Sequence, residues 1–460
     1  MSGLPTTWRS IALDKLIQKI EAGLNVKCEE RPPRNGEKGL VKISAVTWGR
    51  FNQEQSKTLP ANAEVNETAR ISAGDLLISR ANTIELVGAS VIVGSINKQL
   101  YLSDKVLRLV VPNDSKRWIN YALKLPSVRK AIEESSSGNQ LSMRNISQDK
   151  LRSIEIPLAP HPEQKRIADK LDTVLARVDA CRERLNRVPL ILKRFRQSVL
   201  AAGMSGSLTT QWRHRSGHME SNEIKTLSEI AGVIDPHPSH RTPSLVVNGV
   251  PYVGIGEVDR KGNLNLLAAK TVSWDVYEDH KSRYQIRDGD FMFGKIGTLG
   301  RPTRLPADEK YVVSANVILI QPNPEKVDPA YLLLFFSSPK VLSDIAGQAS
   351  STSQAAFGIK KMRSFPLSLP TKPEQEEVVR RVKILLAFAD RLEARLATAQ
   401  TTADRLTPAL LAKAFRGELV PQDPNDELAA ELLKRLTAAR ESAPKGKRSS
   451  KSNSTVAEKA

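Results

Sequence analysis

Residues 162–180 read PEQKRIADKLDTVLARVDA, and residues 373–391 read PEQEEVVRRVKILLAFADR. Gln164 and Gln375 hold the same place in the two stretches, and the difference of 211 between their numbers continues without a gap over residues 156–208 of the first copy. Two unrelated amphipathic helices would not keep one register over such a length. The pattern therefore indicates an internal duplication.

Apolar residues recur in both copies at alternating steps of four and three, which is the a/d pattern of a coiled coil. The first copy has Ile167, Leu171, Val174, Val178, Cys181, Leu185, Val188, Leu192, Phe195 and Val199, and adding 211 gives Val378, Val382, Leu385, Ala389, Leu392, Leu396, Ala399, Ala403, Leu406 and Leu410. We expect two long helices that pack on each other through these seams. Cys181 should be a core thiol, and Pro189 should kink the first helix.

The segments before the two helices are also related, though more weakly. Residues 74–78 and 289–293 both read as a short apolar strand opened by a Gly-Asp turn. Residues 118–134 and 330–345 each read as a helix. We therefore predict an α/β (α+β) chain with two similar mixed strand–helix modules, each followed by a long helix. The expected order is a first module over 1–155, a helix and connector over 156–215, a second module over 216–366, a second helix over 367–420, and a tail over 421–460 with a short helix and a basic, disordered end.

The charge balance points to a polyanionic partner. The formal net charge is +19 and the pI is about 9.8, whereas the hydrophobic fraction of 40% is ordinary for a globular protein. Such an excess of Lys and Arg usually serves nucleic acid or an acidic membrane face, the alternative being a merely well-charged surface. No apolar run long enough to span a bilayer is present, and residues 1–15 lack a signal-peptide pattern. Two distant cysteines suit a reducing compartment, so we expect a cytoplasmic protein with no membrane partner.

A search for catalytic motifs finds none. Residues 294–300 are glycine-rich but lack the Gly-Lys-Ser/Thr ending of a phosphate-binding loop. His214 and His218 have a spacing that a helix could use for a metal, but they lie in a polar connector without a Cys or acidic partner in a recognisable motif. His237 and His240 lie in a probable loop, where they could contact DNA or only solvent. We predict no catalytic residue, no metal site and no bound cofactor.

Candidate DNA-contacting residues are polar or cationic side chains on the expected loops, because such groups read base edges and hold phosphates. A plain surface loop is the alternative for each of them. The candidates are Arg80, Asn82, Gln140 and Arg144 in the first module, and Arg241, Lys295, Thr298, Gln354, Lys360 and Lys361 in the second.

At this point the chain resembles a known family, the specificity subunits of type I restriction–modification enzymes. The resemblance rests on the two Pro-Glu-Gln helices and on the stretches LKRFRQSVL (192–200) and LLAKAFRGEL (410–419), and it covers about residues 4–440. It implies that each module is a target-recognition domain for one half of a split DNA sequence. It also implies that the two long helices form an antiparallel pair. The loop candidates above come from position and chemistry, not from the family.

The resemblance further implies partners. Two methyltransferase (modification) subunits would dock on the helices, and two restriction/translocase subunits could join them. S-adenosylmethionine, ATP and Mg²⁺ would then belong to those partners, which agrees with the missing motifs. Two rival interpretations stay open at this point. One is a standalone DNA methyltransferase or nuclease, and the other is a non-catalytic coiled-coil scaffold that binds DNA without sequence preference.

Overall fold

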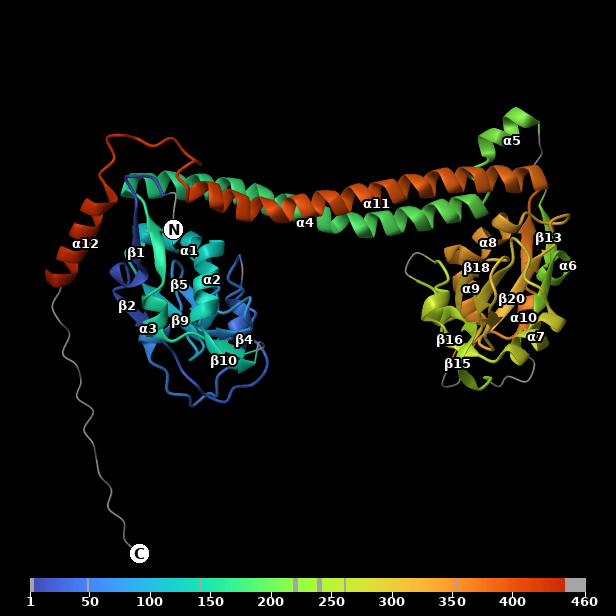
Figure 1. Ribbon diagram of the computed structural model, residues 1–460, viewed down its shortest axis with the longest axis horizontal. Helices are drawn as coiled ribbons and strands as arrows, with labels where there is room; N and C mark the ends of the chain where they lie inside the picture. Colours follow the sequence, from blue (N-terminus) through green and yellow to red (C-terminus); the bar gives the residue numbers. More distant parts are fainter. Residues whose placement is uncertain are drawn as a thin grey trace, which may run out of the picture. The chain divides into compact units, whose positions relative to one another are not determined.

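The computed structural model describes residues 4–47, 49–140, 143–217, 222–237, 242–259, 262–351 and 355–442. The chain divides into two compact units (Figure 1). Unit 1 comprises Met1–Arg184 together with Gln400–Ala460, and unit 2 comprises Leu185–Ala399. Each unit therefore holds one module and a part of both long helices. Among the described helices, none combines the length and the apolar character needed to cross a membrane.

The two long helices are α4 (His161–Met204) and α11 (Lys372–Ala414), and they are antiparallel (Figure 1). In unit 1, Arg182 on α4 donates to the carbonyl oxygen of Ala403 at 2.9 Å. In unit 2, Arg196 on α4 forms an ion pair with Asp390 at 2.7 Å. Residue numbers thus rise along α4 as they fall along α11. The paired helices of the sequence prediction are confirmed.

Most of the seam is buried as expected. Ile167, Leu171, Val178, Val378, Val382 and Leu396 are buried, and Val174, Leu185, Leu385 and Leu392 are half-buried. Pro189 lies inside α4 without ending it.

The core position predicted for Cys181 is wrong, because this thiol is exposed, and Leu406 is exposed as well. Arg182 takes the inward position next to Cys181. On α11, Ala403, Thr407 and Leu411 face inward in steps of four. The seam there is shifted by one residue from the heptad positions predicted at Leu406 and Leu410.

The two modules share one strand topology. The first central sheet has the order β2 (Lys19–Glu21), β9 (Val106–Val110), β5 (Leu76–Ser79), β7 (Ser90–Ile92). The second has the order β14 (Ala231–Ile234), β20 (Val317–Pro322), β17 (Phe291–Gly294), β18 (Gly300–Arg304). All neighbours are antiparallel in both sheets.

A second sheet in each module repeats the match. It has the order β4 (Ser56–Thr58), β3 (Lys38–Val41), β8 (Gln99–Tyr101) in the first module, and β16 (Lys270–Val272), β15 (Leu245–Val253), β19 (Val312–Val313) in the second. The last pair is parallel in both. The strand before each long helix also pairs alike: β12 (Glu155–Leu158) pairs with β1 (Arg9–Ala12), and β23 (Pro366–Leu369) with β13 (Glu223–Thr226). The duplication thus extends from the helices to the whole module.

Shorter elements complete the modules. They are β6 (Ala81–Asn82), β10 (Ser137–Gln140), β11 (Met143–Asn145), α3 (Gln148–Arg152), α5 (Thr210–Ser216), α6 (Leu227–Ile230), α7 (Trp274–Arg283), β21 (Ser350–Ser351), β22 (Ala355–Ala356) and α10 (Ile359–Arg363). Six short 3-10 turns, over 13–15, 43–45, 67–69, 113–115, 255–257 and 266–268, lie among the described residues.

Each module has its own aromatic core. In unit 1, the indole of Trp8 lies 5.3 Å from that of Trp118, and the Phe415 ring lies 4.5 Å from Trp118. Ala429 and Leu432 of α12 (Ala429–Ser442) belong to the same core. In unit 2, six buried phenylalanines belong to the core: Phe291, Phe293, Phe335, Phe336, Phe357 and Phe365. The core of unit 1 therefore joins the N-terminal module to residues that follow α11.

Two helices predicted as continuous are each divided. Residues 118–134 fall into α1 (Lys116–Ala122) and α2 (Pro126–Ser135), and residues 330–345 fall into α8 (Pro329–Ser337) and α9 (Pro339–Gln348). Both second helices begin with a proline. Because a residue before proline is pushed out of helical geometry, Leu125 and Ser338 adopt extended backbones that separate the pairs.

Candidate nucleic-acid interface

Each module adds a small hairpin beyond the same end of its central sheet. In the first module the chain leaves β5 through Arg80 and forms β6, which pairs with β11; β11 then pairs with β10. In the second module the chain leaves β17 through Lys295, and Ile296 bridges to Ala356 on β22, which pairs with β21. These hairpins and their roots carry five of the ten DNA-contacting residues predicted from sequence, namely Arg80, Asn82, Gln140, Arg144 and Lys295.

Arg80 and Lys295 occupy equivalent places at the root of these hairpins. The Arg80 amide donates to the Lys105 carbonyl at 2.8 Å, and its own carbonyl accepts from the Ile146 amide at 3.0 Å. The Lys295 amide and carbonyl make the same two bonds, to the Asn316 carbonyl at 3.0 Å and from the Phe357 amide at 2.8 Å. The first residue after the central strand is therefore a cation in both modules.

The surroundings of the two cations differ. The Arg80 side chain is half-buried and has no hydrogen-bond or ion-pair partner within the part of the chain that the structure describes. The Lys295 side chain is only 5% exposed, and its Nζ lies 3.1 Å from Asp235 Oδ1. One cation is available to an external anion, and the other already has an internal counterion.

Two other candidates of the first module, Asn82 and Arg144, make hydrogen bonds within the hairpin or at its base. Asn82 is buried: its Oδ1 accepts from the Thr83 amide at 2.9 Å, and its Nδ2 lies 3.4 Å from Ser79 Oγ. The Arg144 guanidinium donates to Ser136 Oγ at 3.1 Å and to the Gly138 carbonyl at 2.9 Å. The side chain of Gln140 lies outside the described residues. Contact of these residues with DNA stays a prediction.

In the second module three of the predicted lysines come together. Lys295, Lys360 and Lys361 line a hollow of about 560 Å³, with Asp235 beside them and Phe357 among its apolar walls. Lys360 is exposed, and Lys361 Nζ donates to the Gln348 carbonyl at 2.7 Å. Thr298 is exposed in the turn between β17 and β18. The predicted residues Arg241 and Gln354 lie outside the described residues.

The second module also contains a buried pair of histidines, and sequence reasoning missed one of the two, His280. His237, expected to contact DNA or solvent, is only 4% exposed, so that expectation is wrong. Its ring packs 4.0 Å from the ring of His280, which hydrogen-bonds with the Tyr284 hydroxyl at 2.9 Å. Burial lowers the pKa of His237 to about 4 and also lowers the pKa of His280. Both rings are therefore neutral at pH 7.

Over the described ranges, no three His, Cys, Asp or Glu side chains come together in a way that could hold a metal ion. His214 is exposed on α5, and His218 and His240 lie outside the described residues.

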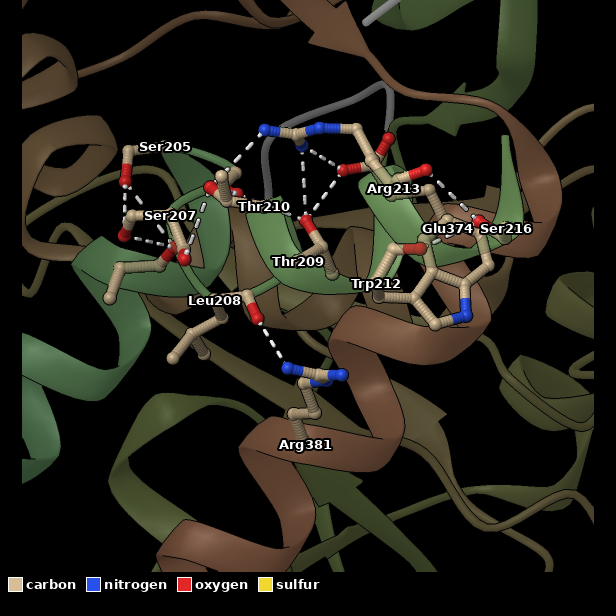
Figure 2. Close-up of polar contacts among 12 residues, drawn as sticks. Ser205, Ser207, Leu208, Thr209, Thr210, Trp212, Arg213, Ser216, Glu374 and Arg381 are labelled. Atoms are coloured by element: carbon tan, nitrogen blue, oxygen red, sulfur yellow. Dashed lines mark hydrogen bonds and ion pairs between the residues drawn. The ribbon is translucent and has the colours of Figure 1, made fainter. Parts of the chain in front are cut away.

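The Pro-Glu-Gln motif of unit 2 is a buried anchor (Figure 2). Glu374 is buried. It accepts a hydrogen bond from the Thr209 hydroxyl at 2.6 Å and forms an ion pair with Arg213. Arg381, two turns further along α11, donates to the Leu208 carbonyl at 2.7 Å. The start of α11 is thereby tied to the segment that follows α4.

The motif of unit 1 is built on the same plan with other partners. Glu163 is buried and accepts from the Trp8 indole N–H at 2.8 Å. Arg166 forms an ion pair with Asp426, in the segment that follows α11. Burial raises the pKa of Glu163, against the opposing effect of the Trp8 hydrogen bond. In each unit, the start of one long helix is thus tied to the chain that follows the other.

Comparisons with known proteins agree with this architecture. The model of the type I restriction modification DNA specificity domain matches twice, over residues 19–190 and 219–399. The EcoBI specificity subunit of Escherichia coli is 28% identical over 97% of this chain and 94% of its own length. The EcoKI specificity subunit of E. coli K12 is 29% identical over 90% of this chain and 91% of its own length. The chain belongs to the family of type I restriction–modification specificity subunits.

Solved structures show the same fold. A chain from a study of complex assembly and conformational transition of the type I restriction–modification system matches with a TM-score of 0.60 at 17% identity, covering 90% of this chain and 99% of that chain. The HsdS subunit from Thermoanaerobacter tengcongensis matches with a TM-score of 0.53 at 17% identity, covering 90% and 98%. The predicted two-module architecture is confirmed.

Proposed function

We propose that this specificity subunit reads a bipartite duplex DNA target, with one half-site for each module, and that it has no catalytic activity of its own. The observation that carries the proposal is that the two modules share their central sheet but differ in the residues of the hairpins beyond it. The two central sheets share one topology and register, yet the residues on the hairpins at their ends differ. Two copies of one frame with different reading faces suit a target made of two different half-sites.

The partners follow from membership of the family. The paired helices α4 and α11 would dock two modification subunits, and two restriction/translocase subunits would complete the complex. S-adenosylmethionine, ATP and Mg²⁺ would then be bound by those partners. The net charge of +19 supports the DNA part of this proposal, because phosphate neutralisation supplies most of non-specific binding.

A module exchange tests the proposal. Residues 1–155 are replaced by the equivalent region of a relative, and the hybrid is expressed with its modification subunit. Methylated sites are then mapped across the genome. We expect one half of the recognised sequence to change while the other half stays. A change in both halves, or in neither, contradicts independent reading by the modules.

The rival functions give different results. A non-specific scaffold would bind a pool of random-sequence duplexes without enriching any sequence. A standalone enzyme would transfer methyl groups or cut DNA without partners, whereas we expect the purified chain to do neither.

A further inference from the structure

The acidic partner of Lys295 has no counterpart in the first module. Leu109 on β9 pairs with Ile20 on β2, just as Ile320 on β20 pairs with Val233 on β14. Two residues further along the outer strand, the first module has Ala22 and the second has Asp235. Arg80, which has no side-chain partner among the described residues, therefore goes with an alanine, and the paired cation Lys295 goes with an aspartate.

Asp235 is itself part of a junction. The Oδ1 atom that binds Lys295 also accepts from the amide of His237 at 3.2 Å. The His237 ring is buried between His280, at 4.0 Å, and Tyr252, at 5.6 Å. The Lys295 carbonyl accepts from the amide of Phe357, directly after β22. Lys295 thus connects the turn after β14 with the hairpin formed by β21 and β22.

We infer that Lys295 is a positioning residue that holds the reading surface of the second module in shape, whereas Arg80 in the first module binds a DNA phosphate directly. The inference rests on the proposed function. A cation that is already paired with a carboxylate releases no counterion when DNA binds, and moving it to a phosphate would break its ion pair with Asp235. The Arg80 guanidinium, for which the described part of the chain supplies no partner, has neither restriction.

Salt dependence separates the two roles. Binding of the full chain to one mixed-sequence duplex is measured over a series of salt concentrations. The affinity falls as salt rises, and each lost phosphate contact lowers the magnitude of the slope of log K against log salt by about 0.9; slope below means this magnitude. We expect Arg80→Ala to lower the slope by about 0.9. Lys360→Ala is the matched control in the second module, since Lys360 is exposed in the same hollow as Lys295. It should behave like Arg80→Ala, and Lys295→Ala should leave the slope unchanged.

Sequence preference gives the complementary readout. Wild-type chain and variants select from a pool of random-sequence duplexes, and the module exchange identifies which half-site belongs to the second module. Lys295→Ala should weaken the sequence preference at that half-site and leave the preference at the other half-site unchanged. Lys295→Arg should restore the preference. If Lys295→Ala does not fold, Asp235→Asn carries the test. It keeps an acceptor near Lys295 but removes the counter-charge, so the slope should rise by up to about 0.9.

The reciprocal change tests the equivalence of the two sites. Ala22→Asp should give Arg80 a carboxylate partner and lower the slope by about 0.9 in the wild-type chain. In the Arg80→Ala background the same substitution should have little effect, which separates ion pairing from general repulsion of DNA.

The inference is overturned if the slope falls in Lys295→Ala as much as in Lys360→Ala while the sequence preference at the second module's half-site is unchanged. Failure of the wild-type chain to select any sequence would instead overturn the proposed function.

Discussion

The two Pro-Glu-Gln motifs place the same carboxylate in the same buried position and satisfy it in different ways. Glu374 receives a hydroxyl and a guanidinium, from Thr209 and Arg213. Glu163 receives an indole N–H from Trp8, and its second oxygen is buried without a hydrogen-bond partner among the described residues. The duplication has kept the acceptor and the helix start, while the donor that meets them has changed from a cation to a neutral ring. A repeated motif therefore fixes where a contact is made but not its chemistry.

Removing the guanidinium of Arg213 should have the largest effect on the free energy of unfolding. Arg213→Ala leaves Glu374 buried without a charged partner, and breaking such a pair costs about 3–5 kcal/mol. Amide hydrogen exchange at the start of α11 and denaturant unfolding of unit 2 measure the loss. Arg215, exposed on the same short helix, is the matched control, and Arg215→Ala should change stability by less than about 0.5 kcal/mol. Equal effects of the two variants would show that Glu374 does not depend on the ion pair.

Removing the indole N–H of Trp8 should lower the free energy of unfolding by less. Trp8→Phe keeps an aromatic ring beside Trp118 but deletes the N–H that binds Glu163. A buried acceptor left unsatisfied costs about 1–3 kcal/mol, measured as the denaturant stability of unit 1. Trp274→Phe, at an indole that is half exposed, serves as the control and should be nearly neutral. A loss of the same size in both variants would mean that ring volume, not the N–H, is what matters at Trp8.

The smallest expected effect is on pH dependence. Because burial raises the pKa of Glu163 in the folded state, the unfolded chain loses this proton first as the pH rises. The contribution of Glu163 to stability is therefore complete below its ordinary pKa and is lost as the pH rises through the folded-state value. Glu163→Gln should remove this dependence, so the stability difference between wild type and variant grows with pH and then levels off.

Stability curves of unit 1 at several pH values measure the effect. Glu376→Gln, at an exposed position near the start of α11, is the control. Parallel curves for wild type and Glu163→Gln at all pH values would contradict the interpretation.

Much of the fold was predictable because it depends on periodic patterns. The 211-residue offset and the alternating seam are enough, by themselves, to indicate two paired helices. The failures occur where local geometry departs from the period. Cys181 follows the heptad in sequence, but its thiol is exposed and Arg182 turns inward instead. Pro126 and Pro339 were readable as helix starts, and their effect on the preceding residue was missed.

The candidate site was only partly predictable. Arg80 and Lys295 lie six residues after the glycines of the two Gly-Asp turns, Gly74 and Gly289, so their equivalence was readable from the sequence. The contrast between Ala22 and Asp235 was not, because it depends on which strand lies beside β9 and β20 and in which register. The burial of His237 likewise depends on α7, which is distant in sequence and brings His280 against it.

The division of the chain into units has a consequence for its synthesis. Unit 2 is continuous, from Leu185 to Ala399, whereas the core around Trp8 and Trp118 also needs Phe415, Ala429 and Leu432. A ribosome that adds about 5–20 residues per second completes the sequence of unit 2 before it has made any of these three residues. The N-terminal module is translated before unit 2, yet its aromatic core stays open to solvent and to chaperones until residues 415–432 emerge. Of the two units, the one whose translation starts first is therefore the one that completes its core second.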